Sequence, residues 1–371
     1  MKQAEKEKRA LLKEVALVFL KLGALAFGGP AAHIAMMEEE VVHRRKWLGK
    51  EAFMDMLGFT NLIPGPNSTE MAIHLGFERA GRAGLFIAGA CFILPAAILV
   101  GLLAHIYQAY GTVPSVAHLF DGMKPVILAV VAQAIFRLGK AVLKKADMAV
   151  LFAFVFPGAV LGLPEIPLLL GAGLVMFLTR KQKEGRPRAL AVEPITLGAL
   201  FFVFLKIGTV LYGSGYVLIA FLESELVKNV PALTARQLLD AVAVGQFTPG
   251  PVFTTATFVG YLIHGLPGAA LATAGIFLPS FLLVLVLRPV MAKMRASRPL
   301  SHVLDGINAA SLALMAAVAV KLGMQTLVFW PHIILFAASV LLLIRFKVHS
   351  ALLMAGGAAA GMLLGLLGIS P

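Results

Sequence analysis

The stretch "NLIPGPNSTEMAIHLGF", residues 61–77, decides the fold, because a Pro-Gly-Pro triplet interrupts an apolar region at this point. Two prolines around a glycine prevent an α-helix from continuing, since each proline lacks a backbone N–H and its ring clashes with the preceding turn. The chain of 371 residues is 59% hydrophobic and only 14% charged. The triplet therefore predicts a broken helix inside a very apolar protein.

The composition of the whole chain is typical of a membrane protein that crosses the bilayer several times. Its mean hydropathy is +0.89, and the runs 84–106, 148–178 and 268–287 each supply the roughly 20 apolar residues that a helix needs to cross. The net charge of +13 comes from short basic clusters between apolar runs, which is typical of membrane-protein loops rather than of nucleic-acid binding. We predict an all-α polytopic membrane protein surrounded by the lipid bilayer.

The chain is an internal duplication. Residues 19–30, "FLKLGALAFGGP", return as "FLKIGTVLYGSG" at residues 204–215, and Pro64-Gly65-Pro66 returns as Pro249-Gly250-Pro251, in each case 185 residues further on. After a one-residue deletion the offset becomes 184 and the register continues. We predict two homologous halves, namely a first transmembrane repeat at residues 1–180, a basic linker at 181–193 and a second transmembrane repeat at 194–371.

Loop charges indicate how the two halves lie in the membrane. In the first half the turn around Arg79 and Arg82 is basic and the loop 107–120 has no Lys or Arg. In the second half the turn 264–267 has none and the loop 288–298 is basic. Because cytoplasmic loops carry the excess of Lys and Arg, equivalent loops lie on opposite sides. The sequence thus predicts an inverted-topology repeat with broken or re-entrant helices and about five crossings in each half. The side of the N-terminus stays open, because its basic residues do not fit an outside position.

A new helix is expected to begin after each break, and its first backbone N–H groups suit an anion. These amides have no partner within the helix, and the positive end of the helix dipole lies there. Irregular backbone at membrane depth survives only inside protein or around water, so we expect both breaks to line an internal cavity. The predicted anion-binding residues are Pro64, Gly65, Pro66, Asn67, Ser68, Thr69, Pro249, Gly250, Pro251, Thr254 and Thr255.

Charged residues near the breaks have two interpretations each. Glu70 either caps the helix that begins at Asn67 or is a protonatable, substrate-binding group beside the anion path. Lys21 and Lys206 occupy equivalent positions in the two halves. They either provide the counter-charge that binds the anion or extend to the nearest membrane surface.

Other polar residues are expected to be structural. Asp121 and Asp305 precede glycines at the start of apolar runs, where helix N-capping is expected, and His118 and His302 are expected at the membrane surface. The nine histidines show no metal-binding spacing, and the single cysteine, Cys91, excludes a disulfide framework. No Gly-x-x-x-x-Gly-Lys-Ser/Thr motif is present, so ATP hydrolysis is not expected. We predict no metal, no cofactor and no enzymatic activity.

Several of these segments together resemble the chromate ion transporter family in its long form with two homologous halves. They are residues 19–30, 38–53 ("EEEVVHRRKWLGKEAF"), 61–67 ("NLIPGPN"), 246–251 ("QFTPGP") and the Asp-Gly pairs at Asp121 and Asp305. The resemblance implies a bacterial inner-membrane protein that exports chromate, a tetrahedral oxyanion similar to sulfate, driven by the membrane potential or the proton gradient. From the family motifs it also implies substrate-binding roles for Gly28, Gly29, Asn61, Gln246 and Thr248.

The second half departs from the family pattern, and several alternatives stay open. Its "YGSG" motif has no proline at the position of Pro30, and Val252 replaces Asn67, so the two half-sites are not expected to be equivalent. Sulfate or another oxyanion is an alternative substrate, and an anion channel or a non-transporting scaffold is an alternative function. A homodimer is left open, and no nucleic-acid partner is expected.

Overall fold

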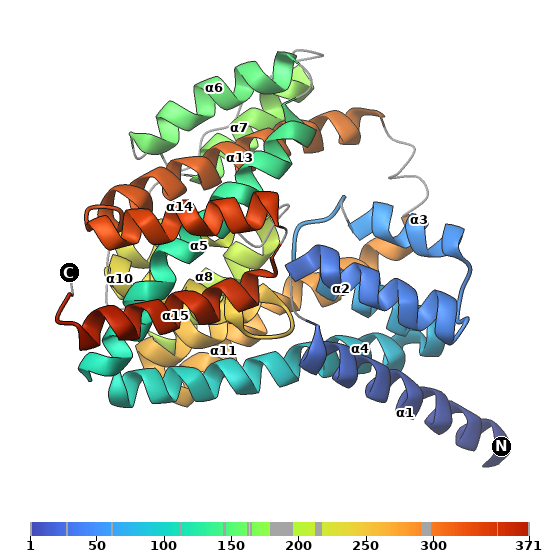
Figure 1. Cartoon of the computed structure of the whole chain (residues 1–371). Helices are drawn as coiled ribbons and strands as arrows, with labels where there is room; N and C mark the ends of the chain where they lie inside the picture. Colours follow the sequence, from blue (N-terminus) through green and yellow to red (C-terminus); the bar gives the residue numbers. More distant parts are fainter. Residues whose placement is uncertain are drawn as a thin grey trace. The chain divides into compact units, whose positions relative to one another are not determined.

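The computed structural model describes residues 2–26, 29–60, 62–111, 113–143, 146–161, 163, 165–178, 196–211, 217–290, 298–346 and 348–369. Throughout these residues the regular elements are helices, and no β-strand occurs among them (Figure 1). The prediction of an all-α fold is therefore confirmed. The predicted linker 181–193 lies outside the described residues.

The chain divides into two compact units, each of which draws on both halves of the sequence. Unit 1 comprises Met1–His105, Leu197–Gly215 and Val244–Ala296, and unit 2 comprises Ile106–Thr196, Tyr216–Ala243 and Ser297–Pro371. Unit 1 contains α1 (Lys2–Leu25), α2 (Gly29–Glu38), the π-helix η1 (Glu39–Arg44), α3 (Lys50–Thr60), most of α4 (Asn67–Tyr110), α8 (Leu197–Val210), η3 (Val252–Thr254), α11 (Thr255–Leu287) and η4 (Arg288–Val290). Unit 2 contains α5 (Pro114–Val142), α6 (Ala146–Val160), α7 (Glu165–Leu178), α9 (Val217–Leu222), the π-helix η2 (Glu223–Asn229), most of α10 (Ala235–Phe247), α13 (Arg298–Thr326), α14 (Trp330–Arg345) and α15 (Ser350–Leu366).

The long helix α4 is in fact a helical hairpin. The backbone leaves the helical region at Ala80 (φ −141°) and Gly81 (φ 64°). A β-carbon built on Gly76 would overlap the carbonyl oxygen of Gly84, and one built on Gly84 would overlap that of Gly76. In a continuous helix, residues eight positions apart would be separated by about 12 Å. The chain therefore reverses at Ala80–Gly81 into two packed arms.

The equivalent helix α11 repeats this hairpin in the second half. Its non-helical residues are His264 (φ −137°) and Gly265 (φ 59°), and Gly260 lies against Gly268 as Gly76 lies against Gly84. The first arm of α4, residues 67–79, is about 20 Å long, which is too short to cross a hydrocarbon core of about 30 Å. The two hairpins thus have the dimensions expected of re-entrant segments.

Other features recur at equivalent positions in the two halves. Both contain a π-helix, η1 and η2, at the corresponding place in the sequence. Within unit 1, Gly23 of α1 packs against the backbone carbonyl of Phe92, and Gly208 of α8 packs against that of Ile276. Because Phe92 and Ile276 are themselves equivalent, α1 meets α4 as α8 meets α11. The prediction of two homologous halves is confirmed.

Several helices have the length and apolar composition needed to cross a membrane. Among the described residues four meet both criteria, two from each half: Asn67–Tyr110, Val116–Phe136, Val252–Leu287 and Asp305–Thr326. The first and third contain the hairpins, so their second arms are the crossing portions. The protein is a multi-pass membrane protein.

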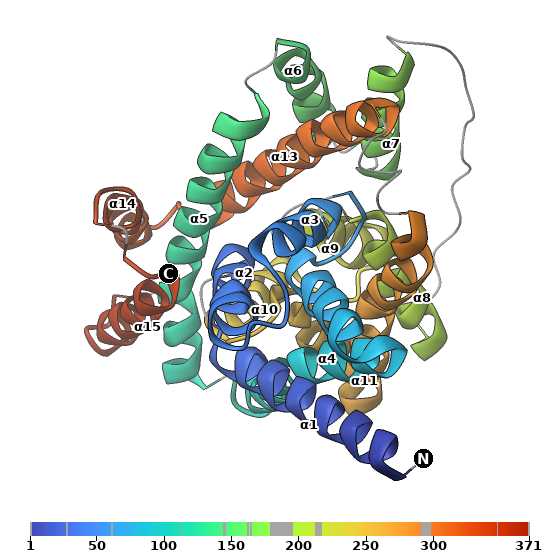
Figure 2. The same cartoon turned by 90° about the vertical axis from the view of Figure 1, so that its right-hand side faces the viewer.

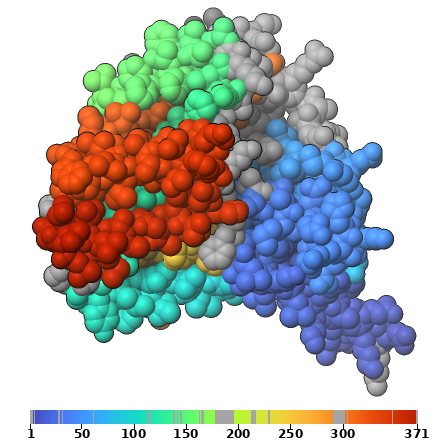
Figure 3. Space-filling view, in the orientation of Figure 1, coloured from blue at the N-terminus to red at the C-terminus, as the bar shows by residue number. Residues whose placement is uncertain are grey.

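Unit 2 is built around α5 and α13. Helix α13 packs against α5, α6 and α7, and both α14 and α15 pack against α5 (Figures 1 and 2). Helices α14 and α15 lie at the surface in the space-filling view of Figure 3, and apolar side chains such as Leu341, Leu352 and Leu366 are exposed there. Such an apolar outer face suits contact with lipid tails.

The N-capping roles predicted for Asp121 and Asp305 are wrong. Helix α5 begins at Pro114 and α13 begins at Arg298, so both aspartates lie about two turns inside a helix. Asp121 is nearly buried and forms ion pairs with Lys124 and Arg236. The sequence marks where the apolar run begins, whereas each helix extends further toward its N-terminus.

Candidate functional site

Both Pro-Gly-Pro breaks lie in unit 1 and have similar backbones. The first break joins α3 to α4, and the second joins α10 to η3 and α11. Gly65 has a φ of 135° and Gly250 a φ of 86°, values that residues with a β-carbon rarely adopt. The prediction of a broken helix at each triplet is confirmed, and the central glycine is what permits the observed path.

Each break is hydrogen-bonded to the opposite half of the chain. The Gly65 N–H donates to the Leu211 carbonyl oxygen (2.8 Å), and the Gly250 N–H donates to the Ala26 carbonyl oxygen (2.9 Å). Leu211 is the repeat equivalent of Ala26, so the same contact is made twice with the halves exchanged. This reciprocity is the mark of a two-fold relation. The first break thus contacts the C-terminal end of α8 and the second contacts that of α1, both within unit 1.

The helix start after the first break is buried. Thr69 and Glu70 are fully buried, and their backbone amides donate to the Pro66 carbonyl oxygen at 2.7 and 3.1 Å. Those two amides are therefore already satisfied within the first turn. Ser68 is 2% exposed and Asn67 is half-buried.

The Glu70 side chain connects the first break with the second half of the chain. Its Oε1 accepts a hydrogen bond from Ser280 Oγ (3.3 Å) and lies so close to Gly65 that a β-carbon there would overlap it. Within the described part of the chain, Glu70 Oε2 and Thr69 Oγ1 are buried and have no hydrogen-bond partner. Buried polar atoms without partners are costly, so they mark a place where a proton, a water molecule or a polar ligand is accommodated. The Glu70 carboxyl thus contacts the second half of the chain through one oxygen, while its other oxygen has no hydrogen-bond partner among the described residues.

The second break offers hydroxyl groups, but these are already used. Thr254 Oγ1 donates to the Pro251 carbonyl and Thr255 Oγ1 to the Val252 carbonyl, both at 2.8 Å. Thr248 Oγ1, just beyond the end of α10, donates to the Val244 carbonyl of that helix at 2.9 Å. In this conformation the three hydroxyl protons serve the local backbone, so they contact an anion only if the first turn opens. Gln246 is half-buried in the last turn of α10.

Two buried histidines near the breaks were not among the predicted site residues, because histidine was considered only as a metal ligand or, at His118 and His302, as a membrane-surface residue. His33 Nε2 contacts the Ala26 carbonyl oxygen (3.1 Å), the same oxygen that accepts the Gly250 N–H. His74 lies four residues after Glu70, and its ring packs edge-on against Phe59 with 5.1 Å between centroids. Across the described residues, both ring nitrogens of His74 and Nδ1 of His33 have no hydrogen-bond partner. The spacing of Glu70 and His74, which places them on one helix face, was the available signal.

The two lysines do not join this buried set. Lys21 Nζ donates to Glu40 Oε2 (3.1 Å), and the Lys21 side chain is 47% exposed. Glu40 also accepts a hydrogen bond from Arg45 (2.9 Å). Lys206 is likewise exposed. The structure thus places Lys21 in an ion pair with Glu40 of the π-helix η1, and both lysines are exposed.

In the first half of the chain, a network of charged side chains surrounds Glu14 of α1. Glu14 accepts hydrogen bonds from Arg45 (3.1 Å), Trp47 (3.0 Å) and Arg79 (2.8 Å), and the Arg79 guanidinium lies 5.3 Å from the centre of the Trp47 ring. Burial alone would raise the pKa of Glu14, but the hydrogen bonds from Arg79, Trp47 and Arg45 outweigh it and lower that pKa. The network ties η1 and the turn of the α4 hairpin to α1.

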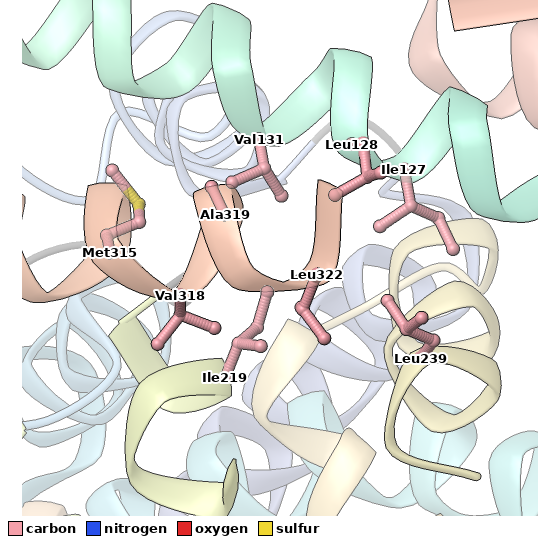
Figure 4. A pocket seen from close by; sticks show the side chains of 9 residues that line it. All are labelled: Ile127, Leu128, Val131, Ile219, Leu239, Met315, Val318, Ala319 and Leu322. Atoms are coloured by element: carbon pink, nitrogen blue, oxygen red, sulfur yellow. The ribbon is translucent and has the colours of Figure 1, made fainter. Parts of the chain in front are cut away.

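Two pockets of unit 2 have apolar linings that do not suit a dianion. The pocket in Figure 4 lies among α5, α9, α10 and α13 and is lined by apolar side chains such as Ile127, Leu239 and Val318. A wider groove is lined by Phe136, Phe152, Phe156 and other apolar residues. No group of acidic, cysteine or histidine residues able to hold a metal ion occurs in the described ranges.

Some predicted site residues fall outside these observations. Gly28 and Asn61 lie outside the described residues, as does the "YGSG" motif at residues 212–215. Gly29 begins α2 with a φ of 77°. Of the predicted site residues, the structure therefore places Gly65 and Glu70 together beside the end of α8, and Gly250 beside the end of α1.

Comparison with known proteins gives consistent matches along the chain. The family model described as chromate transporter matches residues 13–177 and again residues 198–362. A chromate transport protein of Cupriavidus metallidurans is 30% identical, over 94% of this chain and 92% of its own length. A chromate transport protein of Pseudomonas aeruginosa is 30% identical over 83% of this chain and 80% of its own. An uncharacterised transporter of Methanocaldococcus jannaschii is 27% identical over 92% of each chain. No solved structure matches the chain.

Proposed function

The chain belongs to the chromate transporter family, whose members are transporters rather than enzymes, and from that premise we propose that it exports chromate across the bacterial inner membrane as a secondary transporter. The observation that carries the proposal is that each broken helix is hydrogen-bonded to the opposite half of the chain, and that the first break carries the buried Thr69 and Glu70. Secondary transporters bind substrate where broken helices of two repeats meet, near the middle of the membrane.

The charge of chromate supports the direction of transport. Moving one elementary charge through 100 mV is worth about 2.3 kcal/mol, so a dianion gains about 4.6 kcal/mol per 100 mV when it leaves a cell that is negative inside. Export is therefore favoured by the membrane potential alone, whereas uptake would need several coupled cations. We assign the membrane potential as the main driving force.

Glu70 is proposed to control the site through its protonation. An ionised carboxylate repels a dianion, and at short range in a buried place this repulsion is strong. A protonated carboxyl instead offers a hydrogen-bond donor to an oxyanion. Chromate is therefore expected to bind when Glu70 carries a proton, and the lack of a partner at Oε2 leaves that atom free to hold it.

The inverted arrangement of the two halves stays part of this proposal. It is supported by the opposite loop charges and by the two-fold exchange of the Gly65 and Gly250 hydrogen bonds. Inverted repeats are related by a pseudo-two-fold axis that lies in the membrane plane, and such an axis exchanges equivalent contacts of the two halves. Single cysteines placed at residues 82, 112, 265 and 295 in a Cys91→Ala background, labelled from outside, test it. Residues 112 and 265 should react and residues 82 and 295 should not; labelling of 82 and 265 from the same side would contradict the inversion.

Flux in proteoliposomes tests the transport itself. Labelled chromate should leave vesicles containing the protein faster when the interior is made negative, and the rate should saturate with chromate concentration. A rate that never saturates would indicate an anion channel instead. Sulfate added at the same side measures the selectivity between the two oxyanions. Flux no greater than that of protein-free vesicles would overturn the proposal.

A further inference from the structure

Unit 2 contains a buried cluster of charged residues that the transport site does not use. It joins Tyr107 at the end of α4, Asp121 and Lys124 on α5, and Arg236 and Asp240 on α10. Asp240 is 1% exposed, and Asp121 and Lys124 are each 9% exposed. A cluster of this composition inside a membrane protein is costly and calls for a specific role.

The two cations of the cluster both bind the same carboxylate. Lys124 Nζ forms an ion pair with Asp121 Oδ1. Arg236 reaches both Asp121 oxygens, at 3.2 and 3.3 Å. The Arg236 side chain is 55% exposed, so this side of the cluster is open to the surroundings. The charge of Asp121 is therefore well compensated.

The charge of Asp240 is compensated much less than that of Asp121. Its Oδ2 accepts a hydrogen bond from the Tyr107 hydroxyl at 2.6 Å. Its Oδ1 is buried without a hydrogen-bond partner, and in the part of the chain that the structure describes no cation lies within ion-pair distance of it. The titratable and charged groups that face it are Tyr107 from α4, Asp121 and Lys124 from α5, and Arg236 from its own helix.

We propose that Asp240 is a proton-binding site, filled and emptied through the side of the cluster where Arg236 is exposed. Burial favours protonation of a carboxylate that has one unpaired oxygen, because the neutral acid gives up less hydration free energy than the ion does when it leaves water. The proton resides on Oδ1, the oxygen without a partner, while Tyr107 holds Oδ2. No electron transfer or further reactant is involved.

The position of Asp240 links the proton site to the second break along one helix. Asp240 lies nine residues before Pro249, on the helix that leads into the second break. A change of charge on α10 therefore acts on the element that ends at that break. This consequence for transport rests on the proposed function, whereas the proton site itself does not.

Infrared difference spectra of the purified full-length protein between acidic and alkaline buffer test the proton site directly. Wild-type protein should show the carbonyl band of protonated buried carboxyls, and Asp240→Asn should lose one component of it. The matched control is Asp55→Asn, at the equivalent position of the first half, where the aspartate is exposed; it should keep the band unchanged. An identical band in wild type and Asp240→Asn would overturn the proposal.

Tyr107→Phe provides a second test that keeps the aspartate in place. The Tyr107 hydrogen bond favours the ionised form, so its loss should move the Asp240 component to higher pH by about one unit or more. A shift to lower pH, or no shift, would contradict the assignment. These spectra do not depend on chromate flux, so a failure of the transport proposal and a failure of the proton site give different results. In flux assays Asp240→Asn should flatten the pH dependence of chromate export.

Discussion

At the first break the helix that follows Pro66 carries Glu70 and His74, whereas the equivalent positions after Pro251 carry Thr255 and Val259. The backbone is alike at both places, with a left-handed glycine and the same exchanged hydrogen bond. The side chains are not alike, because the first half contributes titratable groups with unpaired atoms and the second contributes hydroxyls that already donate. The two halves thus share the backbone geometry of the break, but only the first has titratable side chains at these positions.

The largest effect should come from changing the shared geometry. Gly65→Ala places a β-carbon against Glu70 and Ser280 at a φ of 135°, and Gly250→Ala places one 2.7 Å from the Ala96 Cβ at a φ of 86°. Strain and overpacking together cost roughly 2 to 6 kcal/mol. We expect each variant to reduce chromate flux at least tenfold.

Gly356→Ala serves as the control for these two variants. Gly356 lies inside α15, and no atom would meet an added β-carbon within 4 Å. Alanine is the better helix former by about 1 kcal/mol, so accumulation and flux should be unchanged or improved. Normal flux in Gly65→Ala with loss in Gly250→Ala would show that the two breaks are not equivalent even in backbone.

The next effect should separate the chemistry of the two halves. Glu70→Gln keeps the shape but cannot release a proton, so chromate flux should fall several-fold and lose the part of its pH dependence that Glu70 contributes. Thr255→Val removes a hydroxyl that bonds only its own helix, at about 1 kcal/mol of stability, and should change chromate affinity less than twofold. Flux measured from acidic to alkaline pH compares the two. Equal losses in both variants would contradict the division of chemistry.

His74 should show a conflict between stability and transport. His74→Leu removes two buried ring nitrogens that lack partners and keeps an apolar group beside Phe59, so unfolding should require about 1 to 3 kcal/mol more free energy. Transport should nevertheless fall, because the polar face shared with Glu70 is lost. Thermal unfolding and flux of the same preparation check both parts. A variant that is less stable and still transports would show that His74 is only structural.

The smallest effect should come from Glu14, whose network exists in the first half alone, since Ala199 stands at the equivalent position. The pKa of Glu14 is lowered in the folded protein. Its contribution to stability is therefore complete above its pKa in the unfolded chain and is lost as pH falls through the lower folded value. Glu14→Gln should lower the free energy of unfolding at neutral pH by less than about 1 kcal/mol, which is seen as a slightly lower melting temperature. In acid the melting temperature should not change. A difference that persists in acid would show that packing, not charge, holds this network.

Local chemistry allowed much of the fold to be predicted. Pro-Gly-Pro breaks a helix whatever surrounds it, so both broken helices were foreseen, and the apolar run 84–106 falls within the second arm of α4. The duplication could be predicted because matching segments recur at a nearly constant offset in the sequence. The π-helices have no such local pattern and were not foreseen.

Long-range contacts account for what was missed at the site. Lys21 was predicted either to bind the anion or to extend to the membrane surface, and its contact with Glu40, nineteen residues away, depends on the packing of α1 and η1. The hydroxyls of Thr254 and Thr255 were expected to be free donors, and their own carbonyls take them. The contact of Glu70 with Ser280 spans 210 residues, a distance in sequence over which a single chain gives no pairing signal.

The exchanged hydrogen bonds also set an order of events during synthesis. Gly65 donates to Leu211, a residue that leaves the ribosome roughly 7 to 30 s later at ordinary elongation rates of 5 to 20 residues per second. Throughout that interval the first break has no permanent acceptor for its amide, and hydrocarbon cannot supply one. The first re-entrant segment must therefore wait in a hydrated place, at the membrane surface or within the insertion machinery, until α8 has been made. During biogenesis the first break is thus expected to close only after Leu211 has been made, and the second only after Gly250 has been made.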